Sequence, residues 1–169
     1  SGGFLFDNAG FAGEITSVSV TASSMPGIIS GSLSGDFALK ISNQSVAINE
    51  TIDTSSQGTV TIDLPAGPYL RVDGENVDID LAIGPVTQNV TGNLSFEQQS
   101  VDGNELIAVG FSEADLTFEV GGTDLISVED ASGAFLSGTL TDVMSATTDD
   151  GFAGVFNGTI SVSGGPVAS

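Results

Sequence analysis

Hydrophobic and polar residues alternate along most of this chain. Val77, Ile79 and Leu81, for example, are separated by Asp78 and Asp80. A period of two is typical of a β-strand with one buried face. The alternating segments are short, rich in Val, Ile, Thr and Phe, and bounded by turn residues. The pattern predicts strands and no convincing helix. The predicted strands are 15–22, 31–41, 46–52, 59–64, 69–72, 77–83, 90–97, 106–111, 116–120, 125–128, 134–141 and 155–162.

Three of these stretches align with one another. Segments 39–52, 70–83 and 107–120 each hold an alternating triplet, four further residues and a second alternating run, and their starts are 31 and 37 residues apart. A repeat spacing in the thirties favours an elongated, repeat-built β structure, with a β-solenoid or β-roll preferred. An antiparallel β-sandwich or barrel is the alternative, with the four-residue links as hairpin loops.

Glycine-containing pairs mark the expected turns, because glycine adopts a positive φ at little cost. These predicted turns are Asp73-Gly74, Asp102-Gly103, Gly121-Gly122 and Ser132-Gly133.

A longer echo links the two ends of the chain. Residues 1–5 (SGGFL) return as 132–136 (SGAFL), and residues 10–13 (GFAG) return as 151–154. The two shifts, 131 and 141 residues, differ by an insertion in which 144–150 is expected to be a polar loop.

The echo defines the expected domain organisation. We expect residues 1–169 to form a single all-β domain, made of one long repeat (1–131) and the start of the next (132–169). The ends of such a unit resemble the ends of its neighbours, which is typical of a module in a tandem array or of a self-joining subunit.

The charge of the chain narrows its partners. Twenty-two acidic residues stand against Lys40 and Arg71, for a net charge of −20. Such a surface repels phosphate backbones and anionic lipid, so we expect neither nucleic-acid binding nor membrane insertion. No apolar run is long enough to span a bilayer. The first residues lack a Met and a basic signal-peptide region, which favours a fragment or a processed chain.

Composition also argues against catalysis. The chain has no Cys, which excludes disulfides and sulfur metal sites, and no His, the commonest general base and metal ligand. We therefore expect no enzyme and no catalytic residues.

Part of the sequence resembles a known class of repeats. Residues 34–41 (SGDFALKI), 46–51 (VAINET) and 64–72 (LPAGPYLRV), together with the phrase at 10–13, resemble tandem repeats of very large secreted bacterial proteins, some of which carry an N-terminal LEPR-XLL signature. The likeness extends from residue 1 to about residue 138. It implies an extracellular module with a surface, adhesive or matrix role and no catalytic residues. This chain lacks the signature, and its insertion near Met144 departs from the pattern.

Two kinds of acidic feature are candidate sites. Asp78 and Asp80 lie two apart on one predicted strand, a spacing that paired-carboxylate glycosidases can use. We favour a solvated strand face, because the aligned positions of the other segments are not both acidic. Ca²⁺ is the candidate cofactor, with oxygen ligands at the acidic turns 73–76, 102–105 and 149–151. No EF-hand spacing is present, and ordinary acidic turns are the simpler explanation.

The two cations and the terminal aromatics are the candidate contacts. Lys40 and Arg71 occupy the same place in two aligned segments, either as cross-strand partners of carboxylates or as an electrostatic contact between units. Phenylalanines near both ends either fill the core or cover a neighbouring unit, since nothing obvious caps either end. The candidate inter-unit contacts are Phe4, Phe6, Phe11, Phe135, Phe152, Lys40 and Arg71.

Asn-x-Ser/Thr sequons are frequent and would place any glycans at surface turns. The candidate glycosylation sites are Asn43, Asn49, Asn89, Asn93 and Asn157.

These observations favour a structural function. We expect an extracellular or cell-surface β module that extends or self-assembles into a fibre, matrix or adhesin stalk, with itself or adjoining repeats as end-to-end partners. The alternative is a glycan- or Ca²⁺-binding module of a large adhesin. The absence of Trp and the single Tyr count against stacking on sugar rings.

Overall fold

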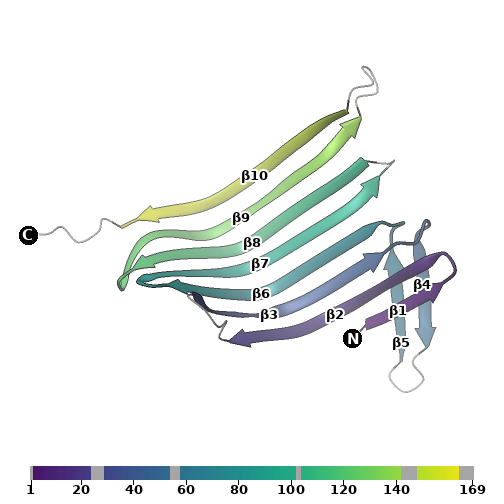
Figure 1. The fold of residues 1–169 in the computed structure, drawn as a ribbon, viewed down its shortest axis with the longest axis horizontal. Coiled ribbons are helices and arrows are strands. Elements are labelled where there is room, and N and C mark those ends of the chain that lie inside the picture. Colours follow the sequence, from purple (N-terminus) through teal and green to yellow (C-terminus); the bar gives the residue numbers. More distant parts are fainter. Residues whose placement is uncertain (1, 24–28, 54–57, 102–103, 142–147, 164–169) are drawn as a thin grey trace, which may run out of the picture.

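The computed structural model describes residues 2–23, 29–53, 58–101, 104–141 and 148–163 (Figure 1). These residues form strands and no helix, so the predicted all-β class is confirmed. Eight strands make one antiparallel sheet in the order β1–β2–β3–β6–β7–β8–β9–β10. The strands are β1 (Gly2–Asp7), β2 (Gly10–Ser23), β3 (Ile29–Ser42), β6 (Tyr69–Ile83), β7 (Val86–Val101), β8 (Asn104–Val120), β9 (Thr123–Thr141) and β10 (Thr148–Val162).

A second, two-stranded sheet covers one corner of the first. Strands β4 (Ile48–Asp53) and β5 (Thr59–Leu64) form a hairpin inserted between β3 and β6, and it lies across the β1–β3 end of the main sheet (Figure 1). Ile62 and Leu64 of β5 form a buried cluster with Ala12 of β2 and Tyr69 of β6. This corner is where the described chain has a conventional two-layer core.

The expected solenoid is not confirmed. Strands that follow one another in the sheet pair antiparallel, whereas the coils of a solenoid would stack equivalent strands side by side. The aligned segments 70–83 and 107–120 lie in β6 and β8, which are separated by β7 alone. Their spacing therefore reflects two successive strands and turns of a meander. The sheet is open, because β1 and β10 form its two edges.

Several predicted strands are halves of longer ones. The pairs Asp73-Gly74 and Ser132-Gly133, predicted as turns, lie inside β6 and β9, while Gly121-Gly122 forms the β8–β9 turn as expected. Asp102-Gly103 lies outside the described residues. The strands continue because both flanks of each glycine stay paired to the same neighbours, with only a shift of register between them.

A line of β-bulges crosses the sheet at these shifts. Four non-glycine residues adopt a left-handed conformation there: Ser17 of β2, Asn76 of β6, Glu113 of β8 and Asp130 of β9, with φ of 56°, 50°, 51° and 51°. A residue of this kind inserts one extra position into a strand and sharpens its bend. The unbulged strand β7 carries Gly92 at the same line, with φ of 138°. The long strands β8, β9 and β10 are visibly curved (Figure 1).

One face of the sheet, here called the apolar face, carries rows of hydrophobic side chains. Residues directly opposite one another in an antiparallel pair share a face. One row crosses six strands on one side of the bulge line, and a second row crosses six strands on the other side of that line. The first row is Ile15, Leu39, Val72, Phe96, Val109 and Phe135; the second is Leu33, Ile79, Val90, Leu116, Val128 and Ile160.

The opposite side, here called the polar face, carries the charged and hydroxyl side chains. On one side of the bulge line, a row of the polar face includes Glu14, Lys40, Arg71 and Glu97. On the other side of that line, a row includes Ser32, Asp80, Asn89, Thr117, Ser127 and Ser161. The β4–β5 hairpin packs on this side, since a Cβ on Gly3, whose neighbour in the row is Glu14, would contact Val60 and Ile62.

Burial differs sharply between the hairpin corner and the rest of the sheet. Only six apolar side chains of the described residues are buried, and four of them belong to the hairpin cluster. Among the residues that the structure describes, fourteen large hydrophobic side chains are exposed, and ten of these lie on the apolar face. Within the described chain, no layer covers the apolar face (Figure 1).

Candidate functional site

The two ends of the echoed sequence form equivalent hairpins at opposite edges of the sheet. Phe4 of β1 lies opposite Gly13 of β2, and Phe135 of β9 lies opposite Gly154 of β10. In both hairpins the phenylalanine ring occupies the space that a Cβ on the glycine would need. The same register and the same aromatic-over-glycine contact therefore recur at both edges.

The equivalent strands differ in their neighbours. Strand β9 is paired on both sides, to β8 and β10, whereas its counterpart β1 is paired to β2 alone. Strand β2 likewise has β3 on its second side, whereas its counterpart β10 is the last strand of the sheet. Each edge of the described sheet thus lacks a neighbour that the equivalent strand possesses.

Backbone groups point outward at both edges. The amide of Ser163 donates to the carbonyl of Leu125 on β9, so by alternation the Ile160 N–H points away from β9. At the other edge, the Phe11 carbonyl accepts from the Asn43 amide and the Phe11 amide donates to the Asn43 side-chain Oδ1, so both backbone groups of Phe11 point away from β1. Its partner Phe6 therefore directs its N–H away from β2. Unpaired edges of this kind are templates for further strands.

The five phenylalanines predicted to be inter-unit contacts all lie on the apolar face. Phe4, Phe6 and Phe11 form one cluster, with ring centroids 6.3 Å and 6.4 Å apart. Phe135 and Phe152 belong to a second cluster at the opposite edge, with centroids 5.7 Å apart. Both clusters remain accessible, with Phe6 and Phe152 exposed by 74% and 73%.

Sequence reasoning missed two members of the second cluster. The ring centroid of Phe111 on β8 lies 6.0 Å from the ring centroids of both Phe135 and Phe156. Phe111 is far from the chain ends, and only the strand order brings it beside β9. The alternation of residues 107–111 was the signal that placed its side chain on the apolar face.

The two cations lie side by side on the polar face. Lys40 of β3 is directly opposite Arg71 of β6, and a glutamate flanks the pair on each side. Lys40 Nζ is 3.5 Å from Glu14 Oε2, and Arg71 Nη1 is 3.4 Å from Glu97 Oε2. Within the described residues both cations therefore have carboxylate partners, which supports their structural interpretation.

Arg71 is the more strongly held of the two cations. Its Nε donates to both carboxylate oxygens of Asp73, at 3.0 Å and 2.8 Å. This hydrogen bond is the main cause of a raised Arg71 pKa. The neighbouring Tyr69 is buried beneath the hairpin, and burial, followed by the negative charge of Glu97, raises the pKa of its phenol.

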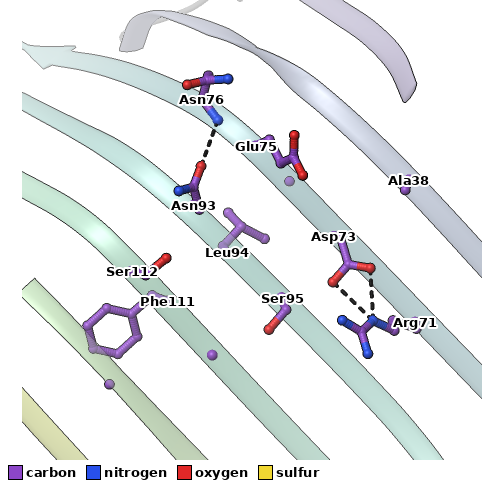
Figure 2. A pocket seen from close by; sticks show the side chains of 13 residues that line it. Ala38, Arg71, Asp73, Glu75, Asn76, Asn93, Leu94, Ser95, Phe111 and Ser112 are labelled. Atoms are coloured by element: carbon purple, nitrogen blue, oxygen red, sulfur yellow. Dashed lines mark hydrogen bonds and ion pairs between the residues drawn. The ribbon is translucent and has the colours of Figure 1, made fainter. Parts of the chain in front are cut away.

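A broad depression lies beside Arg71 on the polar face. It has a volume of about 720 Å³ and follows the bulge line (Figure 2). Small side chains leave this space open, because the row beside Asp73 continues through Ser95 and Gly110. Asn93 links its walls by accepting from the Asn76 amide at 3.0 Å and donating to Glu113 at 2.9 Å. The depression offers polar groups but no nucleophile paired with a base.

Asp78 and Asp80 share the polar face as predicted, but an asparagine joins them. Asn89 Nδ2 donates to Asp78 at 2.9 Å and to Asp80 at 2.8 Å. The hydrogen bond from Asn89 to Asp80, followed by one from Ser32, holds the pKa of Asp80 below its usual range. A depressed pKa keeps the carboxylate ionised, which is the opposite of what a glycosidase general acid requires.

The sequons stay predictions, and the structure shows what their amides do. The amides of Asn89 and Asn93 hold the carboxylates named above, and Asn49 Nδ2 is 3.3 Å from Asp63. Asn43 accepts from the backbone amide of Phe11, and Asn157 is exposed on β10.

The acidic turns do not gather into a metal site among the residues the structure describes. No cluster of three or more acidic side chains there is placed to hold a metal ion. Residues 73–76 lie at the β6 bulge, and residues 102–103 fall outside the described ranges.

Comparisons with known proteins add no relative. The chain matches no protein-family profile, no curated sequence and no solved structure. The described residues also contain no helix long and apolar enough to cross a membrane. The resemblance to giant secreted repeat proteins therefore stays a prediction.

Proposed function

We propose that this chain is a structural, non-catalytic extracellular module whose sheet continues across its edges into further units of the same kind. The continuing sheet would form a cell-surface fibre, matrix or adhesin stalk. The observation that carries the proposal is the pair of equivalent hairpins at the two edges.

The equivalence indicates what each edge accepts. In a tandem array, the open side of β1 would take a strand like β8 and the open side of β10 a strand like β3, so the repeating unit is six strands, β1–β2–β3–β6–β7–β8. Between separate copies of the chain the free strands of the described sheet are β1 and β10, so the open side of β10 would pair with the open side of β1 of the next copy. Edge pairing of this kind satisfies the outward N–H groups of Phe6 and Ile160.

The charge of the chain suits this role outside the cell. A net charge of −20 opposes contact between units at low ionic strength. At about 0.15 M salt the Debye length is about 8 Å, so repulsion between charges farther apart is largely screened. Assembly is therefore expected to strengthen as salt is added.

Proline at the two edges tests the proposal. Phe6→Pro with Ile160→Pro removes two outward N–H groups, and an edge position is where a strand tolerates proline. Phe6→Leu with Ile160→Val is the matched control, which keeps both N–H groups and both side chains apolar. Multi-angle light scattering should show wild-type assemblies larger than a dimer, retained by the control and lost by the proline pair. The proposal fails if wild type forms nothing larger than a dimer, or if both pairs behave alike.

A further inference from the structure

We infer that the apolar face is covered by the apolar face of a second copy of this chain, giving a two-layer sandwich. This contact is separate from the edge-to-edge continuation proposed above, because it uses side chains of the sheet face rather than backbone groups of its edges. It assigns a partner to the rows of hydrophobic residues that the described chain leaves open.

The chain exposes more surface than a compact protein of its mass. The chain exposes 10796 Å². A compact protein of 16.9 kDa should expose about 7,700 Å², so the surplus is about 3,100 Å². The eight strands of the sheet span roughly 34 Å by 45 Å, or about 1,500 Å² for one face. Covering that face removes about 1,500 Å² from each copy, about half of the surplus of one chain. The total of about 3,000 Å² for the two copies lies in the range of obligate homodimers.

The described residues do not cover this face themselves. The described residues already account for every strand of both sheets, and the β4–β5 hairpin packs on the polar side. The longest run outside the described ranges is six residues, which spans at most about 21 Å even when fully extended. A face about 34 Å wide needs a much larger partner.

Charge and chemistry favour a second copy. Neither apolar row contains a charged residue, and the ion pairs lie on the opposite side, so two such faces meet without like charges between them. The face ends in an aromatic cluster at each edge, which makes it chemically similar from either direction. Two sheets joined in this way pack about 10 Å apart with strands within about 30° of each other. An anionic lipid surface is disfavoured by the net charge of −20.

Lysines on the two faces provide a matched test in the edge-blocked Phe6→Pro/Ile160→Pro chain, where proline replaces two side chains at the edges of the apolar face but keeps both positions apolar. Val109→Lys with Ile126→Lys adds charge to the apolar face, where these side chains are 38% and 42% exposed. Leu136→Lys with Val155→Lys adds the same charge to the polar face, at 46% and 66% exposure. Both pairs replace exposed aliphatic side chains, so they differ chiefly in the face that they alter.

Sedimentation velocity gives the outcomes. The edge-blocked chain should sediment as a dimer of twice 16.9 kDa. The apolar-face lysines should weaken the dimer at least about 100-fold, and the polar-face lysines by less than about threefold. A monomeric edge-blocked chain, or equal effects of the two lysine pairs, would overturn the inference. So would binding of the monomer to neutral phosphatidylcholine vesicles with the dimer absent.

A second pair of substitutions covers the case in which the lysine variants do not fold. If a lysine pair loses the β-sheet circular dichroism spectrum, Val109→Thr with Ile126→Thr replaces it, since threonine keeps strand propensity and adds only hydroxyls. That pair should weaken the dimer at least about tenfold, and unchanged association would count against the inference. If the proline variant still forms assemblies larger than a dimer, edge continuation is contradicted and face packing is not. If the proline variant forms no dimer while the wild-type chain still forms larger assemblies, face packing is contradicted and edge continuation is not.

Discussion

Replacing Arg71 tests the account of the charged row most sharply. Arg71→Gln removes the fork that binds Asp73 at 2.8 Å and Glu97 at 3.4 Å, and it leaves both carboxylates without a cation. The Arg71 side chain is 40% exposed, so solvent screens these ion pairs. Exposed pairs contribute about 0.2–1 kcal/mol each, and we expect a loss of about 0.5–1 kcal/mol.

That loss translates into a small change of melting temperature. A domain of this size shifts by about 2–4 °C per kcal/mol, so Arg71→Gln should lower the Tm by about 1–4 °C at pH 7 and low salt. In about 1 M salt the difference should shrink, because the Debye length falls to about 3 Å. Arg71→Lys is the control, since it keeps the charge and loses the bidentate geometry.

Differential scanning calorimetry with light scattering measures both properties. The variant should melt slightly earlier and keep the assembly state of wild type, because Arg71 is paired within its own sheet. A drop of more than about 8 °C would mean that Arg71 has a larger structural role than its exposure suggests. Loss of assembly would show that Arg71 contacts a neighbouring unit, and would refute the intramolecular interpretation.

Two further measurements test the hairpin corner. Ile62→Ala should lower the free energy of unfolding in urea by about 2–5 kcal/mol, because Ile62 is fully buried. Val46 is exposed, so Val46→Ala, the control, should change it by less than about 0.5 kcal/mol. Similar values for both variants would mean that the hairpin is not packed on the sheet. Tyr69 is the only tyrosine and there is no Trp, so ultraviolet absorbance reports its phenol alone. Burial raises its pKa above the usual value of 10.0, so its stabilising contribution is complete below that pH and is lost as the pH rises through the folded pKa. A tyrosinate midpoint at the ordinary value in the folded chain would contradict this burial.

Alternation predicted the strands well and their boundaries unevenly. The segment 59–64 was predicted as a strand and is β5 (Thr59–Leu64). Residues 69–72 and 77–83 were predicted as two strands and form one, β6. The reason is the bulge. Gly74 and Val77 are three positions apart, so strict alternation would place them on opposite faces, and one extra residue at Asn76 returns both to the same face.

A local signal for these bulges exists in the sequence. Apolar-face residues separated by three positions recur at Ile15 and Val18 and again at Phe111 and Ala114. Each pair brackets a residue with positive φ. In a single strand this odd step looks like the end of one element and the start of another. Only the shared position of the steps across neighbouring strands distinguishes a bulge line from a set of turns.

The candidate site was predictable in its parts but not in its arrangement. The echo between the chain ends correctly paired Phe4 with Phe135 as equivalent positions, because register within a hairpin is local information. The adjacency of Lys40 and Arg71 depends on which strands are neighbours, and the β4–β5 insertion separates those strands in sequence. Strand order is decided by long-range pairing, which the alternation of one chain does not specify.

Negative-stain electron microscopy of the purified chain, in a salt- and calcium-containing buffer, shows whether copies of the chain join at the edges of the sheet. We expect ribbons or end-to-end chains with a regular repeat of one unit, because neighbours complete the sheet at its edges. The proline pair Phe6→Pro/Ile160→Pro should shorten them to dimers. Isolated compact particles of the wild-type chain would mean that its edges need no partner, and would contradict the account.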